Sequence, residues 1–380
     1  MTETAYAKGL EGVIAGESTI CQIDGQNGRL LYRGYGIDDL ARNSTYEETV
    51  YLLLFEKLPT PAEFAAFKEN FRSGRDIAPQ IQDMIRNFPE SGDPMELLQS
   101  VMSYLSGYVA HKIKHSATCN CRETLHQVAQ LPTVIAAYQR FKEGKNYVAP
   151  RPGLAHGANF LYMLRGEEPR PYEAAVMDKC MIIHAEHGFN ASTFTARVVA
   201  SSLSTCYSSI SAAIGSLRGS LHGGANEQVM EMVDEIGGID KVEPWLDKTL
   251  SEKKKIMGMG HREYRVKDPR AHLMEGYLRE LTERKGGNRH LSILLALEKS
   301  FRQRMDQKGK PLYPNVDFFS GGVYEMLGIP RQLFTPIFAM ARSAGWLAHI
   351  LEQRKDNRLF RPECLYTGPR PREYVKIEQR

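Results

Sequence analysis

The chain has 380 residues, of which 42% are hydrophobic and 25% are charged, so it can bury a large core and form two domains or one elaborate one. Its formal net charge of only +4 is too weak to argue for a nucleic-acid partner, so we expect none, and it is compatible with small anionic substrates. No hydrophobic run approaches the roughly 20 residues that span a membrane, and residues 1–16 show neither the basic start nor the apolar segment of a secretory signal.

The first predicted element is a small β-hairpin. Two short runs of β-forming residues, 19–23 and 29–32, flank the turn sequence Asp-Gly-Gln-Asn-Gly at 24–28. Glycine and asparagine favour such a turn because they tolerate backbone conformations that other residues avoid.

Beyond the hairpin, the sequence predicts helices. Ser44 with Glu47, and Thr60 with Glu63, have the spacing of capping boxes, and Pro61 suits the first position of the second helix. Apolar residues then recur at helical spacing in six further segments: 94–109, 133–141, 172–203, 225–236, 291–305 and 333–351. We therefore expect a mainly α protein with breaks marked by glycine and proline.

Two glycine-rich stretches interrupt the helices, and each carries a histidine. His222 stands before Gly223 and Gly224, ahead of a helix expected to start near Asn226. Glycines let the backbone approach a ligand closely, so His222 is a candidate to present its ring to a substrate. An exposed histidine in a capping loop is the alternative.

The second stretch, 253–261, combines three lysines, a Gly-x-Gly turn and His261, and Arg270 follows it. Lysine charges and backbone N–H groups that converge at such a turn can meet phosphates. A solvated basic end of a helix is the alternative, although His261 and Arg270 make a functional site the more specific interpretation.

Asp317 and Arg342 both stand among apolar residues. The neighbours of Asp317 are Val316, Phe318 and Phe319, so we expect a raised pKa and a role as a base. A helix N-cap is the alternative. Arg342 lies inside an apolar helical pattern, where a buried guanidinium needs an anionic partner. That partner is either a substrate carboxylate, bound through two hydrogen bonds, or a structural ion pair.

Two groups of residues have the side chains of metal ligands, but we expect a metal at neither. His184 and His187 have the i, i+3 spacing of one helix face, and histidines so placed are more often packed and hydrogen-bonded. The other group matches no standard zinc spacing and is expected in a polar loop: His115, Cys119, Cys121 and His126.

The cysteines do not form the pattern of a disulfide framework. Six are spread over the chain: Cys21, Cys119, Cys121, Cys180, Cys206 and Cys364. We therefore expect reduced thiols and a cytoplasmic location.

Taken together, these segments resemble the citrate synthase family. The motifs that carry the resemblance follow the family's order from Gly9 to about Gly368: Gly9-Leu-Glu-Gly12, Tyr32-Arg-Gly34, His184-Ala-Glu-His187-x-x-Asn190-Ala-Ser-Thr193, Leu221-His-Gly-Gly-Ala-Asn-Glu227, Met257-Gly-x-Gly-His-Arg262, Asp268-Pro-Arg270, Tyr313-Pro-Asn-Val-Asp317, Leu327-Gly-Ile-Pro330, Phe334-Thr-Pro-x-Phe338 and Gly345-Trp-Leu-Ala-His349. Several motifs in one order are far more specific than any of them alone.

The resemblance implies a large helical domain, residues 1–222 and 330–380, and a smaller inserted helical domain, residues 223–329. It also implies a homodimer. Because the chain lacks the long N-terminal extension of the family's hexameric branch, we expect the short dimeric type without NADH inhibition.

The resemblance further implies which residues act on the substrates. Asp317 would remove the methyl proton of acetyl-CoA, His222 would hydrogen-bond the enol oxygen, and His261 would polarise the oxaloacetate ketone and protonate the new alkoxide. Four residues would hold oxaloacetate, the last of them reaching the site of the partner subunit: His187, Arg270, Arg342 and Arg361. CoA would contact five consecutive residues: Lys255, Ile256, Met257, Gly258 and Met259.

This chemistry calls for no metal or redox cofactor, because a carboxylate base needs only groups that stabilise the enolate. Glu263 and Gly322 depart from the family's pattern, which has aliphatic residues there, and Glu263 adds a negative charge near the expected CoA contact. Two alternatives stay open. One is a 2-methylcitrate synthase, which uses propionyl-CoA with the same catalytic residues, and the other is a non-catalytic metal-binding or assembly protein.

Overall fold

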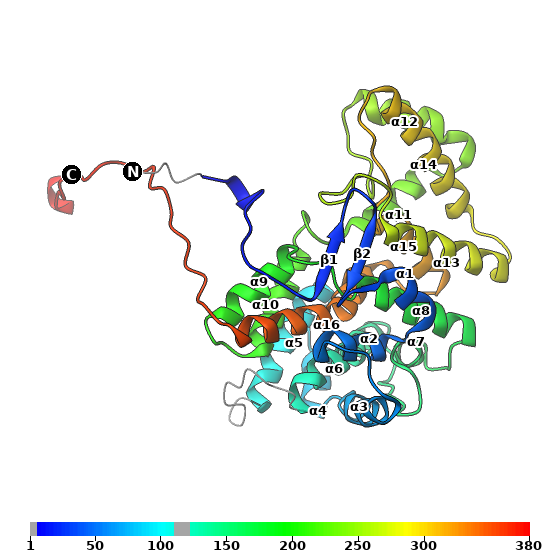
Figure 1. Ribbon diagram of the computed structural model, residues 1–380, viewed down its shortest axis with the longest axis horizontal. Helices are drawn as coiled ribbons and strands as arrows, with labels where there is room; N and C mark the ends of the chain where they lie inside the picture. Colours follow the sequence, from blue (N-terminus) through cyan, green and yellow to red (C-terminus); the bar gives the residue numbers. More distant parts are fainter. Residues whose placement is uncertain (1–5, 110–121) are drawn as a thin grey trace.

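The computed structural model describes residues 6–109 and 122–380, and it confirms the mainly α fold with one small β-sheet (Figure 1). The expected hairpin is present: β1 (Cys21–Asp24) pairs antiparallel with β2 (Arg29–Tyr32). A short third strand that the sequence analysis missed, β3 (Tyr35–Gly36), pairs with β2.

The helices form two groups along the chain. The first group consists of α1 (Ile37–Asn43), α2 (Tyr46–Phe55), α3 (Pro61–Ser73), α4 (Pro79–Arg86), α5 (Pro94–Val109), α6 (Arg122–Lys142), α7 (His156–Arg165), α8 (Pro171–His184), α9 (Ala191–Ser201) and α10 (Cys206–Arg218). The second group consists of α11 (Ala225–Ile236), α12 (Val242–Ser251), α13 (Pro269–Lys285), α14 (Arg289–Gln307) and α15 (Asp317–Met326). The last long helix, α16 (Phe334–Lys355), returns to the first group. Short 3₁₀ turns complete the elements: η1 (Lys8–Leu10), η2 (Ile239–Lys241), η3 (Arg331–Leu333) and η4 (Ile377–Gln379).

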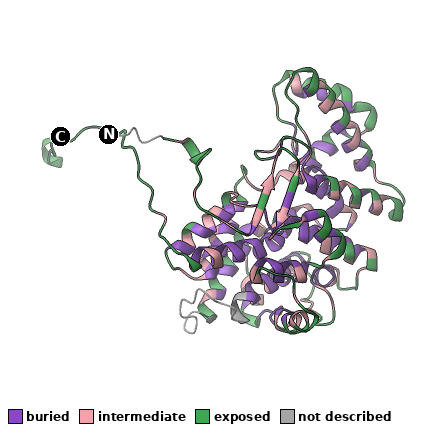
Figure 2. Cartoon of the chain, in the orientation of Figure 1, coloured by how far each residue is buried: buried purple, intermediate pink, exposed green. Residues whose placement is uncertain are grey.

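Helix α16 is the centre of the first group. It contacts α2, α6, α8, α9 and α10, and almost every residue between Phe334 and Ile350 is buried (Figure 2). A helix that is apolar on all sides is stable only in such a position. Arg342 and His349 are therefore carried into the interior by the helix to which they belong.

The second group packs mainly on itself. Helix α15 lies against α11 and α13, and α12 packs on α14. In Figure 1, α11, α12 and α14 form a lobe above the first group, and α13 and α15 lie where the two groups meet. Contacts of α1 and α8 with α13 join the groups at this boundary.

The predicted capping box at Ser44 and Glu47 is wrong by one residue. Thr45 is the N-cap of α2, and its side chain accepts a hydrogen bond from the backbone N–H of the third helical residue. Glu47 is buried and pairs with Arg75 at 2.7 Å instead. The box at Thr60 is confirmed, because its hydroxyl and the Glu63 carboxylate bond reciprocally at the start of α3.

Two predicted helices have different bounds. The segment 133–141 is only the end of α6, which begins at Arg122 and continues through Pro132. The segment 172–203 contains two helices, α8 and α9, separated by residues 185–190. Helix α8 ends at His184, and Gly188 in this break has a φ of +59°, a left-handed conformation that favours glycine and does not continue a helix.

The two ends of the described chain leave the helical body together. Residues 6–17 and 361–380 run outward on the same side in Figure 1, and they expose large apolar side chains such as Ile14, Leu365 and Tyr366. None of the helices in the described residues combines the length and apolarity needed to cross a bilayer.

Candidate active site

A cavity of about 980 Å³ lies where the two helix groups meet. It brings together six of the residues that the sequence analysis singled out, although they are spread over 155 positions of the chain from the first to the last. These are His187, His222, His261, Arg270, Asp317 and Arg342. Arg361 is not among the residues that line it.

Backbone hydrogen bonds join two distant loops at one wall of this cavity. The N–H of Gly260 donates to the carbonyl of Tyr313 at 2.8 Å, and the N–H of Asn315 donates to the carbonyl of Gly258 at 2.9 Å. The Asn315 side chain also donates to the Gly260 carbonyl at 3.0 Å. The loop that carries His261 is therefore fixed against the loop that leads into Asp317.

Asp317 is the first residue of α15, and the N-cap position belongs to Val316, so the N-cap interpretation is wrong. Its backbone N–H donates to the Asn315 side chain at 3.0 Å. Burial raises the pKa of the Asp317 carboxyl to about 6, and Arg270 partly opposes this rise. The carboxylate is thus ionised at neutral pH and is a stronger base than an exposed aspartate.

Ser192, in the first turn of α9, hydrogen-bonds to the ring of His222. The Nε2 of His222 lies 3.2 Å from the backbone N–H of Ser192 and 2.8 Å from the Ser192 hydroxyl, and Trp346 donates its indole N–H to that hydroxyl at 3.1 Å. Burial lowers the pKa of His222 to about 4. Since Nε2 accepts the Ser192 N–H bond, the neutral ring carries its proton on Nδ1, which we assign as a donor.

His261 shows the opposite tautomer. Its Nδ1 accepts from the backbone N–H groups of Glu263 at 3.0 Å and Tyr264 at 3.4 Å, so the proton of the neutral ring belongs on Nε2. Burial, followed by the charge of Arg270, lowers the pKa of His261 to about 4. Both histidines are therefore neutral hydrogen-bond donors near pH 7.

The two arginines of the cavity differ in how their charges are balanced. Arg270 forms a bidentate pair with the buried Asp268, at 3.0 Å from Nε and 2.7 Å from Nη2. Arg342 donates Nε to the carbonyl of His184 at 2.7 Å and packs over the ring of Phe338. Its Nη2 is buried and has no hydrogen-bond partner among the described residues.

A buried guanidinium without a carboxylate partner is costly. Burial lowers the pKa of Arg342, and the Glu186 carboxylate, which is not hydrogen-bonded to it, counteracts this. Because Arg342 opens onto the cavity, an anionic ligand with a carboxylate would supply the missing partner.

His187 lies in the loop between α8 and α9 rather than on a helix, so the predicted helix face shared with His184 is wrong. Its Nε2 is 3.2 Å from the hydroxyl of Tyr264, and its ring centroid is 5.2 Å from that of His261. Burial, followed by the charge of Arg270, lowers the pKa of His187 well below its usual value. The sequence analysis missed the contacts made by Tyr264 and Ser192, because nothing in the local sequence shows that these side chains reach His187 and His222.

The segment expected to bind CoA lies beside the main cavity. Lys255 and Met257 line a second cavity of about 740 Å³, and Ser220 lines both cavities. The walls of this second cavity carry acidic residues such as Glu227 and Glu252 as well as lysines, so the second cavity is not a purely basic phosphate site. The other three residues of the segment are Ile256, which is buried, Gly258, and Met259, which bridges to Pro314.

Glu263 and Gly322, the two residues that depart from the family's aliphatic pattern, lie in different parts of the structure. Glu263 lines the main cavity, where its backbone N–H holds His261. Gly322 belongs to α15, and a Cβ there would meet the side chain of Leu278 at 2.9 Å. The absence of a side chain at Gly322 therefore lets α15 pack closely against α13.

Residues 6–109 and 122–380 contain no group of three His, Cys, Asp or Glu side chains arranged for a metal ion. Of the second group of metal-ligand types, His115, Cys119 and Cys121 lie outside the described residues, and His126 belongs to α6, so the predicted polar loop is wrong for His126.

Comparison with known proteins agrees with this site. The family model described as citrate synthase, C-terminal domain, matches residues 9–363. The citrate synthase of Deinococcus radiodurans is 46% identical over 98% of this chain and 99% of its own length. A 2-methylcitrate synthase of Shewanella oneidensis is 38% identical over 98% of this chain and 97% of its own.

The fold is shared as well. The solved ternary complex of carboxymethyl coenzyme A and oxaloacetate with citrate synthase from Thermoplasma acidophilum superposes with a TM-score of 0.92. It is 32% identical and covers 99% of this chain and 100% of its own.

A mainly α fold whose interior cavity combines a carboxylate base, neutral histidine donors and an unpaired guanidinium defines an acid–base enzyme for an anionic substrate. The match over residues 9–363 and the full-length relatives make the assignment more specific: the chain belongs to the citrate synthase family and is an acyltransferase. This membership favours an enzyme over the non-catalytic alternative.

Proposed function

We propose that this enzyme condenses acetyl-CoA with oxaloacetate and water to give citrate and CoA. The observation that carries the proposal is the pairing of two groups in one cavity: the Asp317 carboxylate, with its raised pKa, and the Arg342 guanidinium, which lacks a carboxylate partner. The first suits proton removal from a weak carbon acid, and the second suits a carboxylate substrate.

Three residues would carry out the carbon–carbon bond formation. Asp317 takes a methyl proton of acetyl-CoA, and Nδ1–H of His222 stabilises the enol oxygen that develops. The new carbon nucleophile attacks the ketone of oxaloacetate, whose oxygen receives the proton of Nε2–H of His261. The citryl-CoA so formed is then hydrolysed by water to citrate and CoA. No step of this scheme calls for a metal or redox cofactor.

The dianionic oxaloacetate would be held by residues from both helix groups. Arg342 and His187 belong to the first group, and His261 and Arg270 belong to the second. We propose that these groups are the domains 1–222 with 330–380 and 223–329. A ligand that touches both would favour a closed arrangement.

For CoA, we propose the second cavity and the segment Lys255 to Met259. Support comes from Lys255 and Met257 in its wall and from Ser220, which connects it with the main cavity. The acyl end would then enter beside His222, while the nucleotide end would stay near Lys255.

We propose a homodimer in which Arg361 completes the site of the partner subunit. Arg361 is exposed and lies in the extended C-terminal segment, and its one side-chain hydrogen bond to a described residue goes to the carbonyl of Pro362. We also propose that the enzyme works in the cytoplasm, because the six cysteines are spread over the chain without the pattern of a disulfide framework, and Cys21, Cys180 and Cys364 are free thiols.

The choice between acetyl-CoA and propionyl-CoA is tested by measuring thiol release. Purified enzyme is mixed with either acyl-CoA, with and without oxaloacetate. We expect release only when oxaloacetate is present, with a higher kcat/KM for acetyl-CoA. A higher value for propionyl-CoA would establish the 2-methylcitrate synthase alternative instead.

A further inference from the structure

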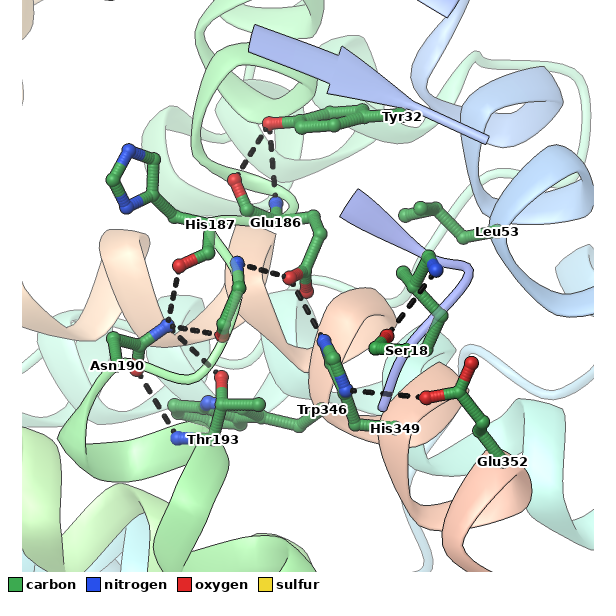
Figure 3. A network of polar contacts seen from close by, with 12 residues as sticks. Ser18, Tyr32, Leu53, Glu186, His187, Asn190, Thr193, Trp346, His349 and Glu352 are labelled. Carbon is green, nitrogen blue, oxygen red and sulfur yellow. Dashed lines mark hydrogen bonds and ion pairs between the residues drawn. The ribbon is translucent and has the colours of Figure 1, made fainter. Parts of the chain in front are cut away.

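The loop between α8 and α9, residues 185–190, is anchored by a row of buried charged and polar side chains (Figure 3). The loop carries His187, which the proposed function assigns to oxaloacetate. A loop of this kind has no helical hydrogen bonds of its own, so its geometry depends on the groups around it.

Glu186 is the first anchor. Its Oε1 accepts a hydrogen bond from the backbone N–H of Gly188 at 2.5 Å and lies 2.9 Å from Nε2 of His349. The side chains of Glu186 and His349 are both 0% exposed. Gly345 of α16 makes room for the carboxylate, because a Cβ at this position would collide with Oε2 of Glu186. The backbone on both sides of His187 is therefore tied to α16.

His349 and Arg197 extend the row to α9. Arg197 donates Nη1 to Nδ1 of His349 at 3.1 Å, so the His349 proton lies on Nε2 and faces Glu186. Arg197 also packs over the ring of Phe189, the second residue after His187, with its guanidinium 4.6 Å from the ring centroid.

Glu352 completes the row on the opposite side. Its Oε2 accepts from Nη1 of Arg197 at 2.8 Å, and its Oε1 accepts from the backbone N–H of Thr19 at 2.9 Å. One continuous set of contacts thus runs from the segment before β1, through α16 and α9, to the loop that carries His187. Phe189 and His187 line the cavity, whereas the four charged or polar side chains of the row do not: Glu186, Arg197, His349 and Glu352.

The geometry points to Glu186, His349 and Arg197 as positioning residues that hold His187 in the orientation needed to bind oxaloacetate. The inference rests on the proposed function, because His187 must contact that substrate. Its physical basis is that buried hydrogen bonds to a binding residue's backbone restrict it to one orientation, and a misplacement of about 1 Å can cost about 100-fold in activity.

His349 is the residue on which this inference can be tested most directly. Replacing Glu186 would also remove the negative charge that acts on Arg342, and oxaloacetate affinity would then change for two opposing reasons. His349→Phe keeps a ring of similar size but removes both nitrogen contacts. His349→Gln retains a donor for Glu186 and is the conservative rescue. His156→Phe is the matched control, because His156 is equally buried but belongs to α7, outside this row.

We expect His349→Phe to raise the KM for oxaloacetate by about 10- to 100-fold while the KM for acetyl-CoA changes less than about twofold. His349→Gln should return the KM for oxaloacetate most of the way to normal. His156→Phe should leave both KM values near normal even if its melting temperature falls. If His349→Phe does not fold, Arg197→Lys, which cannot bridge His349 and Glu352 in the same planar geometry, should show the same split between substrates. Unchanged oxaloacetate KM values in the folded variants, or equal losses for both substrates, would overturn the inference.

A double-mutant cycle separates this inference from the proposed function. We expect His349→Phe to add less than about twofold to the oxaloacetate KM of a His187→Gln enzyme, because the residue being positioned is already gone. If the two losses multiply, the positioning role is wrong while the role of His187 stands. If His187→Gln alone binds oxaloacetate normally, the assignment of His187 to this substrate fails, and the inference fails with it.

Discussion

Asp317 owes its chemical character to its surroundings more than to its residue type. The pKa of its carboxyl is raised to about 6 by burial. Within residues 6–109 and 122–380, no side chain donates a hydrogen bond to that carboxylate, whereas the neighbouring Asp268 is paired with Arg270 through two hydrogen bonds. Two aspartates in one site thus have different tasks. The first is free to take a proton, and the second orients a cation.

Asp317→Asn should lower kcat by at least about 100-fold while the affinity for oxaloacetate stays nearly unchanged. The amide has the size of the carboxylate but cannot accept the methyl proton. The control is Asp178→Asn, because burial also raises the pKa of Asp178 to about 6 outside the cavity. This control should lose stability rather than turnover. Near-normal turnover in Asp317→Asn would remove Asp317 from the mechanism.

The pKa values also predict a pH dependence. Because the base must be ionised, kcat/KM for acetyl-CoA should fall as pH decreases through about 6, by about tenfold per unit below it. His222 and His261 have pKa values lowered to about 4, so they stay neutral over this range and add no second transition. A steady-state profile from about pH 5 to pH 8 checks this, and a flat profile would contradict it.

At the scale of helices and strands, the sequence correctly predicted the elements that depend on local residue patterns. The hairpin, the capping box at Thr60 and the apolar helix α16 follow from short-range spacing, and the structure confirms them. The box at Ser44 failed because Glu47 forms a buried ion pair with Arg75, 28 residues away. The break in 172–203 was missed for a similar reason, since Glu186 bonds to a histidine 163 residues further on.

The same distinction holds for the candidate site. Motif residues such as His222, His261 and Asp317 could be chosen from the sequence, and the structure brings them to one cavity. Their tautomers and charge states could not be chosen, because these depend on contacts from other elements. Ser192 decides the tautomer of His222, and no local signal in the sequence connects the two.

Substitution of Gly258 tests how closely the loop that carries His261 packs against the loop that leads into Asp317. Gly258 has a φ of +74°, and a Cβ would lie 2.8 Å from Cα of Phe318 and 2.9 Å from Cγ2 of Val229. Gly260 is a suitable control, with a φ of +88° but no contact closer than 3.5 Å. Both alanine variants should be strained, and Gly258→Ala should lose about 1–3 kcal/mol more stability. Urea unfolding measures the difference in the free energy of unfolding. Equal losses in the two variants would show that the loops move apart to accommodate the added methyl group.

At the scale of the whole molecule, the cavity lies between two helix groups, so substrate binding should change their relative position. We expect oxaloacetate alone to compact the enzyme, because it would contact Arg342 on one side and Arg270 on the other. Small-angle scattering with and without oxaloacetate measures the change. Trp245 lines the second cavity, so its fluorescence should report closure, and Trp245→Phe should remove that signal. An unchanged radius of gyration would count against closure.

The assembly is tested through Arg361, the proposed oxaloacetate-binding residue that does not line the main cavity of its own chain. It belongs to the exposed segment 361–380 that leaves the helical body. A segment of this kind can cross a two-fold interface, and two-fold symmetry then places each subunit's Arg361 in the site of the other. Arg361→Ala and Asp317→Ala homodimers should each be nearly inactive. In a mixed dimer, one site would combine the intact Asp317 of one chain with the intact Arg361 of the other, while the second site would carry both defects. Dissociating and mixing the two variants should therefore restore a substantial fraction of activity, whereas each variant treated alone should remain inactive. If mixed dimers form but stay as inactive as their parents, Arg361 acts within its own chain and the shared site is wrong.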